Sequence, residues 1–256
     1  MKTITNYTTP SGKVITEYEF VKDLGVTMQN NASFDLQINN IIEVGKQLSG
    51  WILRVFRNRS QQVMLTLWKS LVIPRIEHSS QLWSPQKVNS IQRIEHLQWS
   101  FVRKIDGILN LNYWQALKKL NLYSLQRRRE RYQLIYVWKI LENIVPNFSN
   151  ISVYSHSRRG RLCKTPEVVN HLPKATQNLL YCSLKYTGPR LFNSLPKSVR
   201  DISNCDVNSF KNALDKYLKQ VPDEPQLVGY TMMRRAETNS VIDMCGLMTS
   251  AVPQST

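Results

Sequence analysis

The feature that most constrains the fold is a long series of apolar residues at helical spacing, which begins at Ser33 and continues to about Val145. Residues three and four apart share one face of a helix, so each such series predicts a helix with one apolar stripe. The first three stripes are Phe34, Ile38, Ile41, Ile42, Leu48 and Ile52, then Val63, Met64, Leu67, Trp68 and Leu71, then Ile91, Ile94, Leu97, Phe101 and Val102. We therefore predict a mainly α-helical protein.

Capping and helix-breaking residues divide this series into separate helices. Ser33 and Ser60 are suitable N-caps for the first two helices. Pro74 is expected to end or kink the second helix, because proline lacks a backbone N–H. Pro85 suits the first turn of the third helix, where that N–H is not needed.

Two further helices are predicted, at Tyr113–Leu120 and Ser124–Asn143. Pro146 lies just beyond the second of these, where prolines commonly stop helices. Residues 33–146 are thus predicted to form a helical, thumb-like bundle.

The first 32 residues have a different, strand-like pattern. Thr3–Thr8 and Lys13–Phe20 are rich in Thr, Tyr, Ile and Val, and Pro10-Ser11-Gly12 supplies a turn between them. A third strand is predicted at Leu24–Met28. Because so few strands cannot fold alone, we expect them to pack on the helices or on a segment outside the chain.

Residues 147–221 are predicted to form a mixed, loop-rich C-terminal region. The segment Lys185–Arg190 has the composition of a turn, and a terminal helix is predicted at about Asp206–Leu218. Residues 222–256 give no clear structural signal, so a tail of low order is expected there.

The charge of the chain indicates a polyanionic partner. Lys and Arg number 34 against 18 Asp and Glu, which gives a formal net charge of +16. Such an excess causes self-repulsion unless a polyanion neutralises it, so nucleic acid or an anionic membrane is the expected partner. No apolar run reaches the roughly 20 residues of a membrane-spanning helix, and the N-terminus lacks the apolar segment of a secretory signal. We therefore expect an intracellular protein, in the nucleus, the cytoplasm or both, without a membrane partner.

The sequence contains no recognisable catalytic centre. Nucleotidyl transfer needs carboxylates that converge on Mg²⁺, and the adjacent acidic pair Asp223-Glu224 lies between prolines in a predicted linker. Glycine-rich phosphate loops and the G-x-S-x-G elbow are absent from the sequence. The four cysteines are scattered and are expected to be reduced; a zinc site built from His156, Cys163 and His171 stays open, although its spacing is unfavourable. We predict no catalytic residue, cofactor or metal.

Basic residues gather in short clusters that suit phosphate contact. Four arginines between positions 127 and 131 span more than one helix face, so at least two are expected to project to solvent. Their guanidinium groups can bind phosphate in a bidentate manner. The predicted nucleic-acid-binding residues from these clusters are Arg54, Arg57, Arg59, Arg93, Arg103, Lys104, Arg127, Arg128, Arg129, Arg131, Arg158, Arg159 and Arg161. The alternative is a set of solvated helix faces without a ligand.

Short motifs follow one another in a fixed order through most of the chain. They are Lys22–Val26, Arg54–Phe56, Leu71–Pro85, Ile91–Glu95, Phe101–Ile105, Tyr113-Trp114, Leu120–Arg129, Trp138–Ile140, Tyr186–Pro196 and Ser209–Lys211. The series resembles the reverse transcriptases of LINE-type, non-LTR retrotransposons, in particular the jockey-like branch. No single motif is decisive, and the specificity of the resemblance lies in the ordered series.

The resemblance implies a position within a polymerase. Lys22 to Met28 matches the primer-contacting turn, which adds Lys22 and Gly25 to the predicted nucleic-acid contacts, and the preceding strands match the end of the palm. The residues from Ser33 onward match the thumb and the C-terminal extension. The paired aspartates that hold Mg²⁺ in this family belong upstream of these segments, so the resemblance implies a truncated fragment that is not an enzyme on its own. Its implied partners are an RNA or DNA template–primer duplex and an upstream polymerase portion in trans.

Two alternatives to this interpretation stay open. In the first, the chain is an element-derived structural or interaction protein that its host has adopted and that has no nucleic-acid role. In the second, the chain is the product of a decaying reading frame. The first predicts that mutation of Arg127, Arg128 and Arg129 leaves its function unchanged. The second is tested by detection of the transcript and the protein.

Overall fold

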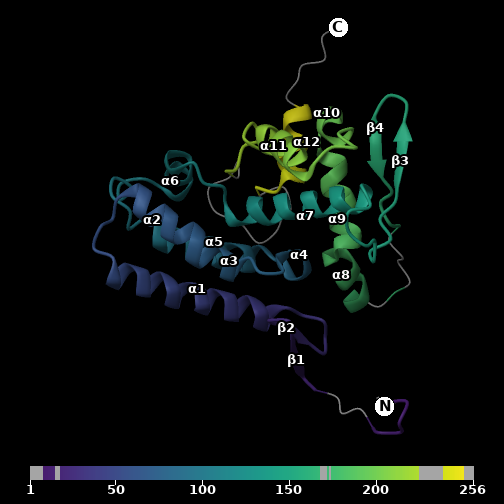
Figure 1. The fold of residues 1–256 in the computed structure, drawn as a ribbon, viewed down its shortest axis with the longest axis horizontal. Coiled ribbons are helices and arrows are strands. Elements are labelled where there is room, and N and C mark those ends of the chain that lie inside the picture. Colours follow the sequence, from purple (N-terminus) through teal and green to yellow (C-terminus); the bar gives the residue numbers. More distant parts are fainter. Residues whose placement is uncertain (1–7, 15–17, 168–171, 173, 225–238, 251–256) are drawn as a thin grey trace.

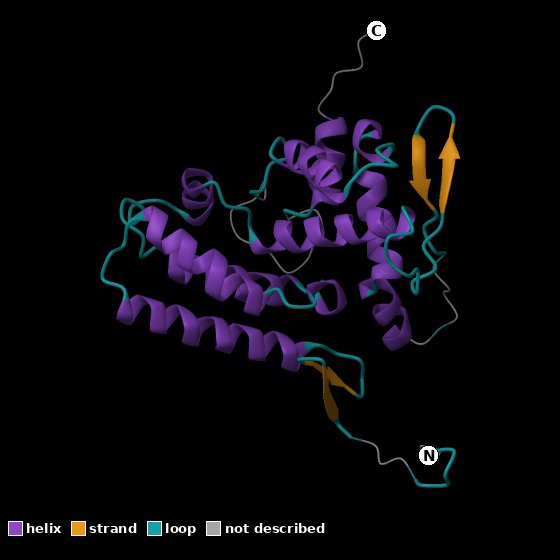
Figure 2. Ribbon diagram, in the orientation of Figure 1, coloured by secondary structure: helices purple, strands orange, loops and turns teal. Residues whose placement is uncertain are grey.

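The computed structural model of the chain describes residues 8–14, 18–167, 172, 174–224 and 239–250. These residues form a mainly helical protein with two small antiparallel hairpins (Figures 1 and 2). The predicted fold class is confirmed: a short N-terminal hairpin is followed by a helical bundle and a mixed C-terminal region.

The elements of the first half of the chain are β1 (Phe20–Asp23), β2 (Val26–Gln29), α1 (Asp35–Val55), α2 (Gln61–Leu67), the π-helical turn η1 (Trp68–Val72), α3 (Ile73–Ile76), α4 (Ser80–Trp83), α5 (Val88–Val102) and α6 (Tyr113–Leu120). Those of the second half are α7 (Leu125–Leu141), β3 (Val153–His156), β4 (Gly160–Cys163), α8 (Lys174–Cys182), α9 (Leu184–Ser194), α10 (Lys197–Arg200), α11 (Val207–Leu218) and α12 (Val241–Ser250). In Figure 1, α7 crosses the middle of the molecule between the two sets.

Two hydrophobic cores correspond to the two halves. In the first core, Trp68 stacks on Phe101 with ring centroids 4.7 Å apart. In the second core, Trp138 stacks on Phe210 at 4.5 Å. Helix α7 contributes its first residue, Leu125, to the first core and its residues from 134 onward to the second. This helix therefore joins the two halves.

Helix α1 runs unbroken along α5 and α3, and Gly45 explains how closely it approaches them. A Cβ atom at Gly45 would lie 2.4 Å from Cδ2 of Leu97 on α5 and 3.0 Å from Cγ2 of Ile76 on α3. The absence of a side chain at this position therefore lets the three helices pack tightly.

The helix that begins after Ser60 does not end at Pro74, and its buried face differs from the predicted one. The chain stays helical through η1 to Ile76, with Pro74 inside it. A π-helical turn inserts one extra residue and rotates the faces of the residues that follow. As a result Leu71, predicted to face inward, is 38% exposed, whereas Val72 is fully buried.

The third predicted helix begins later than Pro85. Helix α5 starts at Val88, with Lys87 as its N-cap. The residues before it form the short helix α4 and a connecting loop that contains Pro85. In contrast, α6 has the predicted bounds, Tyr113–Leu120, and Asn112 and Gln115 form a capping box at its start.

The N-terminal hairpin lies further along the chain than predicted. Strands β1 and β2 pair around Leu24-Gly25, whose φ angles of 44° and 86° are typical of a type I′ turn. Leu24 and Gly25 are therefore turn residues rather than part of a strand. Of the two earlier predicted strands, the described residues contain one isolated bridge, Thr8 to Val14. Residues 1–7 and 15–17 lie outside the described part.

Two predictions for the C-terminal region are wrong. The segment Lys185–Arg190 is not a turn but part of the first half of α9. A Cβ atom at Gly188 would lie 2.7 Å from Cγ2 of Val137, so this glycine marks a close approach of α9 to α7. The expected low-order tail also contains structure, because Asn239 is fully buried and α12 follows it. Residues 225–238 and 251–256 of that tail lie outside the described residues.

Candidate nucleic-acid interface

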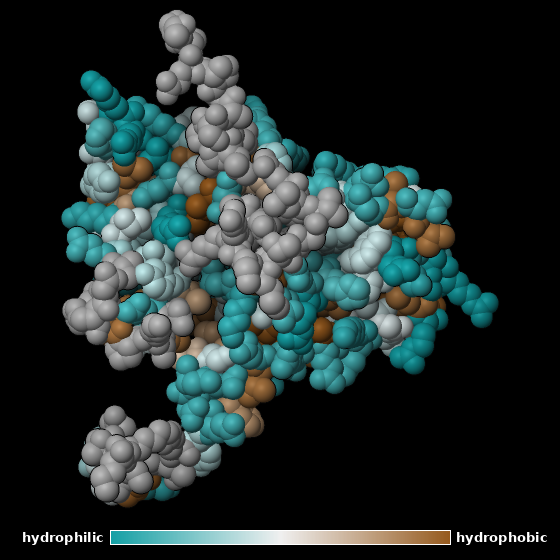
Figure 3. All heavy atoms as spheres, turned by 180° about the vertical axis from the view of Figure 1, so that it is seen from behind, coloured by the Kyte–Doolittle hydropathy of each residue, from teal (hydrophilic) through white to brown (hydrophobic). Residues whose placement is uncertain are grey.

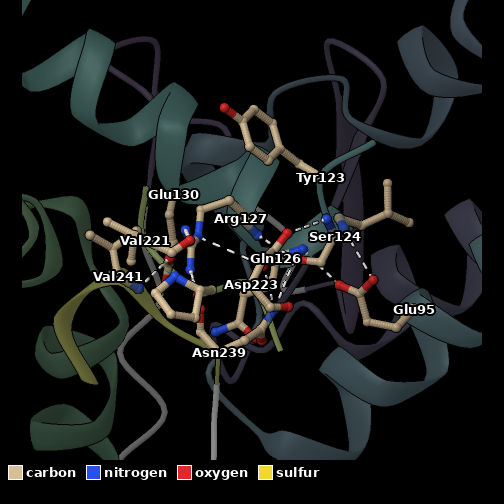
Figure 4. A network of polar contacts seen from close by, with 12 residues as sticks. Glu95, Tyr123, Ser124, Gln126, Arg127, Glu130, Val221, Asp223, Asn239 and Val241 are labelled. Atoms are coloured by element: carbon tan, nitrogen blue, oxygen red, sulfur yellow. Dashed lines mark hydrogen bonds and ion pairs between the residues drawn. The ribbon is translucent and has the colours of Figure 1, made fainter. Parts of the chain in front are cut away.

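The arginines of α7 are used inside the protein rather than displayed on its surface. Arg127 is fully buried, and Figure 4 shows it at the centre of a polar network. Its Nη1 donates to the carbonyl of Val221 at 3.2 Å, and its Nη2 donates to the carbonyls of Pro222 at 2.7 Å and Asn239 at 3.0 Å. Arg127 is therefore not available to a phosphate, and its prediction as a nucleic-acid contact is wrong.

Arg129 is likewise buried, at 2% exposure, beside the carboxylate of Glu95. Glu95 accepts hydrogen bonds from the backbone N–H groups of Leu125 at 3.0 Å and Gln126 at 2.7 Å, and from the hydroxyl of Tyr113. Burial raises the pKa of Glu95 and lowers the pKa of Arg129, because each charge is removed from water. The prediction that Arg129 contacts nucleic acid is therefore also wrong.

Arg128 and Arg131 are part-exposed but already paired. Arg128 binds Glu77 with two hydrogen bonds, Nε to Oε1 at 2.7 Å and Nη2 to Oε2 at 2.8 Å. Arg131 binds Asp215 in the same way, through Nε to Oδ1 and through Nη2 to Oδ2 at 2.7 Å. Burial lowers the pKa of Arg128, but Glu77 outweighs this effect and the pKa is raised overall. The hydrogen bond to Asp215 raises the pKa of Arg131. Both groups remain charged.

Asp223 belongs to the same network and not to a solvated linker. Its carboxylate accepts from the backbone N–H of Ser124 at 2.7 Å, from the Ser124 hydroxyl at 2.8 Å and from Nδ2 of Asn239 at 2.8 Å. Burial raises the pKa of Asp223. The backbone N–H of Val241 donates to Glu130 at 2.8 Å, so the start of α12 is also tied to α7. The network thus fixes the C-terminal segment against the N-terminal half of α7 (Figure 4).

A second group of predicted residues does come together on the surface. The backbone N–H of Asp106 donates to the carbonyl of Arg59 at 3.0 Å, which joins the loop after α1 to the loop after α5. Nζ of Lys119 donates to the carbonyl of Gly107 at 2.9 Å, which brings α6 to the same place. We call this surface the basic end, and define it as Arg54, Arg57, Arg59, Arg103, Lys104 and Lys119.

Most cations of the basic end are open to solvent. Arg54, Arg57, Arg103, Lys104 and Lys119 are exposed, and Arg59 is half-buried because its guanidinium donates to the carbonyl of Leu53. The guanidinium of Arg103 lies over the ring of Trp99, 5.9 Å from its centroid. Lys119 was missed from the sequence, since only the hydrogen bond to the loop after α5 places it here. The arrangement offers several cations with few acidic neighbours, a geometry suited to the phosphates of a nucleic acid.

The other predicted residues lie elsewhere. Lys22 and Gly25 are exposed on the β1–β2 hairpin, and Arg93 on α5 donates to Oδ1 of Asn39 at 2.8 Å. Figure 1 places the β3–β4 hairpin, whose tip carries Arg158 and Arg159, at the other end of the molecule from the start of α2. The predicted contacts therefore do not form one continuous groove.

Arg161 is turned toward the protein, unlike its two neighbours at the hairpin tip. It pairs with Glu142 at 2.8 Å and donates to the carbonyl of Ile202 at 3.2 Å. Arg200, which the sequence did not indicate, holds the hairpin through the carbonyls of Arg161 at 2.6 Å and Arg159 at 2.8 Å. Arg161 and Arg200 are therefore structural supports for a basic tip.

No metal centre is visible among the described residues, which contain no group of three His, Cys, Asp or Glu side chains placed to hold an ion. Cys163 is buried, and burial raises the pKa of its thiol to about 12. His171, the third residue of the zinc site considered from the sequence, lies outside the described part.

None of the helices in the described part of the chain is long and apolar enough to cross a membrane. The described surface seen from behind is largely hydrophilic, with small separate hydrophobic patches (Figure 3).

No family model, curated protein or solved structure matches the chain.

Proposed function

We propose that the chain binds nucleic acid, as RNA, DNA or a template–primer duplex, through phosphate contacts made by its basic end. The observation that carries this proposal is the meeting of three separate segments, after α1, after α5 and on α6, at one surface rich in exposed cations. The net charge of +16 on the whole chain supports an anionic partner. Phosphate contacts of this kind confer affinity with little sequence readout.

We also propose that the chain derives from the thumb and C-terminal region of a LINE-type reverse transcriptase. Support comes from the ordered motifs and from the hairpin at the position that matches the primer-contacting turn. There Lys22 is exposed, and the turn rests on His78, whose Nε2 lies 3.1 Å from the carbonyl oxygen of Leu24. Primer extension by the purified chain should give no product, whereas the genomic sequence upstream of Met1 should encode a paired-aspartate motif.

The binding proposal is tested by salt dependence. A labelled 20-base-pair RNA–DNA duplex is titrated with the chain at several salt concentrations, and binding is followed by fluorescence anisotropy. The logarithm of the affinity should fall linearly with the logarithm of the salt concentration, with a slope of about −0.9 for each phosphate neutralised. An affinity that does not change between low and physiological salt would overturn the proposal.

A triple variant locates the contact. Arg57→Gln, Arg103→Gln and Lys104→Gln together should reduce the magnitude of the slope by about 0.9 for each contact removed. The matched control is Lys197→Gln, Lys216→Gln and Lys219→Gln, which removes the same charge from exposed positions of α10, α11 and its C-cap. Equal losses in the two variants would mean that general charge, and not the basic end, causes binding.

One observation favours a second function, that of an interaction protein without a nucleic-acid role. The densest arginine cluster, on α7, is engaged with Glu77, Asp215 and backbone carbonyls. Part of the positive charge thus has a structural purpose. If the chain is such an interaction protein, the triple variant of the basic end retains every function of the chain, and the duplex titration shows no saturable binding.

A further inference from the structure

A polar hollow of about 290 Å³ lies beside the N-terminal half of α7. The residues that matter here are Lys69 on η1, Tyr123 before α7, Arg128, Arg131 and Tyr132 on α7, and Asp215 on α11. Its volume is close to the lower end of the ligand-pocket range of about 300–1,000 Å³. The hollow is therefore of the size that holds one small ligand.

Two guanidinium groups in the hollow are held in place before any ligand arrives. Arg128 and Arg131 each use Nε and Nη2 to bind one carboxylate, that of Glu77 and that of Asp215. A guanidinium has five N–H donors, so each retains donors for another acceptor. Because the ion pairs already fix these side chains, little side-chain entropy remains to be lost on binding.

The hollow keeps a net positive charge. Lys69 is exposed, so its ammonium is open to solvent at the rim. Together with Arg128 and Arg131 it faces two carboxylates, those of Glu77 and Asp215, which leaves one positive charge in excess. An anionic group such as a phosphate is therefore favoured over a neutral or cationic one.

Aromatic rings supply the second half of the site. The guanidinium groups of Arg128 and Arg131 lie 5.7 and 6.0 Å from the ring centroid of Tyr132, so one ring supports both cations. Tyr123 lines the same hollow, and its hydroxyl donates to the carbonyl of Asp215 at 3.5 Å. Burial raises the pKa of both tyrosines, so their rings remain neutral and suited to stacking with a planar group.

We propose that this hollow binds one nucleotide unit. Its phosphate would lie against Lys69 and the remaining N–H groups of Arg128 and Arg131, and its base against the ring of Tyr123, because the ring of Tyr132 already contacts both guanidinium groups. This chemistry is shared by a free mononucleotide and by a nucleotide of a single strand, in which stacking on aromatic residues is a common mode of binding. The site is distinct from the basic end, because the two share no residue.

Occupation of the hollow has a structural consequence. Lys69 belongs to the helix that carries Trp68 of the first core, whereas Asp215 lies on α11 of the second. A bound nucleotide therefore contacts both halves and favours the state in which they are associated. Saturating adenosine monophosphate should raise the midpoint of thermal unfolding.

The test is calorimetric titration of the full chain with adenosine monophosphate, adenosine and inorganic phosphate. Adenosine monophosphate should bind more tightly than either fragment. Lys69→Gln should weaken its binding about tenfold, which corresponds to ~1.4 kcal/mol. The matched control, Lys197→Gln, changes an exposed lysine on α10 and should leave the affinity unchanged. If adenosine monophosphate binds, equally tight binding of inorganic phosphate would overturn the proposal, as would unchanged affinity in Lys69→Gln.

An octamer of single-stranded RNA identifies the source of the nucleotide. If the octamer binds and depends on Lys69 while adenosine monophosphate does not bind, the ligand is a strand. If octamer binding is lost in the triple variant of the basic end but unchanged in Lys69→Gln, the hollow is not a nucleotide site. That last outcome would leave the proposed function of the basic end intact, so the two failures are distinguishable.

Discussion

The arginines of two regions of this protein differ in their burial and in their pairing with carboxylates. On α7, Arg127 and Arg129 are buried and Arg128 and Arg131 are paired with carboxylates, whereas Arg57 at the basic end is exposed. Both regions have a high density of arginine in the sequence. A high density of arginine alone therefore does not predict phosphate contact. The deciding factor is whether acceptors from distant segments reach the guanidinium groups.

The acceptors for the α7 arginines come from both directions along the chain. Glu77 lies 51 residues before Arg128, and Asp215 lies 84 residues after Arg131. A buried charge needs such partners, because removal from water without them costs several kcal/mol. At the basic end, the chain from Arg54 to Arg59 contains no acidic residue, and the loop after α5 contributes Asp106. Most of those cations therefore remain in water, where an anionic ligand can reach them.

The largest loss of stability is expected for Arg127→Ala. This change removes three hydrogen bonds to carbonyls and leaves Asp223 without its neighbouring cation. Loss of one member of a buried charged network costs about 3–5 kcal/mol, so the free energy of unfolding should fall by that amount. Urea denaturation, with the midpoint and slope compared with wild type, measures it. A loss below about 1 kcal/mol would show that the network is not structural.

Local patterns in the sequence predicted the helices that depend on local forces. The bounds of α6, Tyr113–Leu120, were predicted correctly, and the residues that form its apolar face lie within the helix itself. The burial of Arg127 and Asp223 could not be predicted in this way. Their partners lie about 100 residues away, and no local pattern encodes such a contact.

Helix α9 illustrates a second reason for failure. Gly188-Pro189 has the composition of a turn, and only the packing of α9 against Val137 makes a glycine favourable inside this helix. For the basic end, the sequence indicated Arg57 and Arg103 but not that they would lie together. The hydrogen bond between Asp106 and Arg59, which joins the two segments, is a feature of the tertiary structure.

A smaller loss of stability is expected for Arg129→Met, because methionine keeps an apolar side chain of similar length. Among the described residues, Nε and Nη2 of Arg129 have no hydrogen-bond partner, so fewer bonds are lost than at Arg127. Glu95 keeps its three donors and can take up a proton, because burial already raises its pKa. We expect a loss of about 1–3 kcal/mol at neutral pH by urea denaturation.

The pH dependence of the stability of Arg129→Met tests the role of Glu95 more sharply. Since the folded pKa of Glu95 lies above the unfolded value of about 4.3, the folded state binds more protons than the unfolded state between these two values. Stability should therefore increase as the pH is lowered from neutral toward that unfolded value, and more so in Arg129→Met than in wild type. The double variant Arg129→Met with Glu95→Gln should lack this additional slope. Identical slopes in the two variants would mean that Glu95 is not the group that titrates.

The smallest effect on stability is expected for Arg57→Ala, which tests the other side of the comparison. Arg57 is exposed just after α1, so its loss should change the free energy of unfolding by less than about 0.5 kcal/mol. Its effect should instead be on ligand affinity, with the salt slope for the RNA–DNA duplex reduced in magnitude by about 0.9. Urea denaturation and the anisotropy titration, done on the same preparation, measure both quantities. A variant that loses stability but keeps its salt slope would place Arg57 with the structural arginines of α7, and the distinction between the two regions would then not hold.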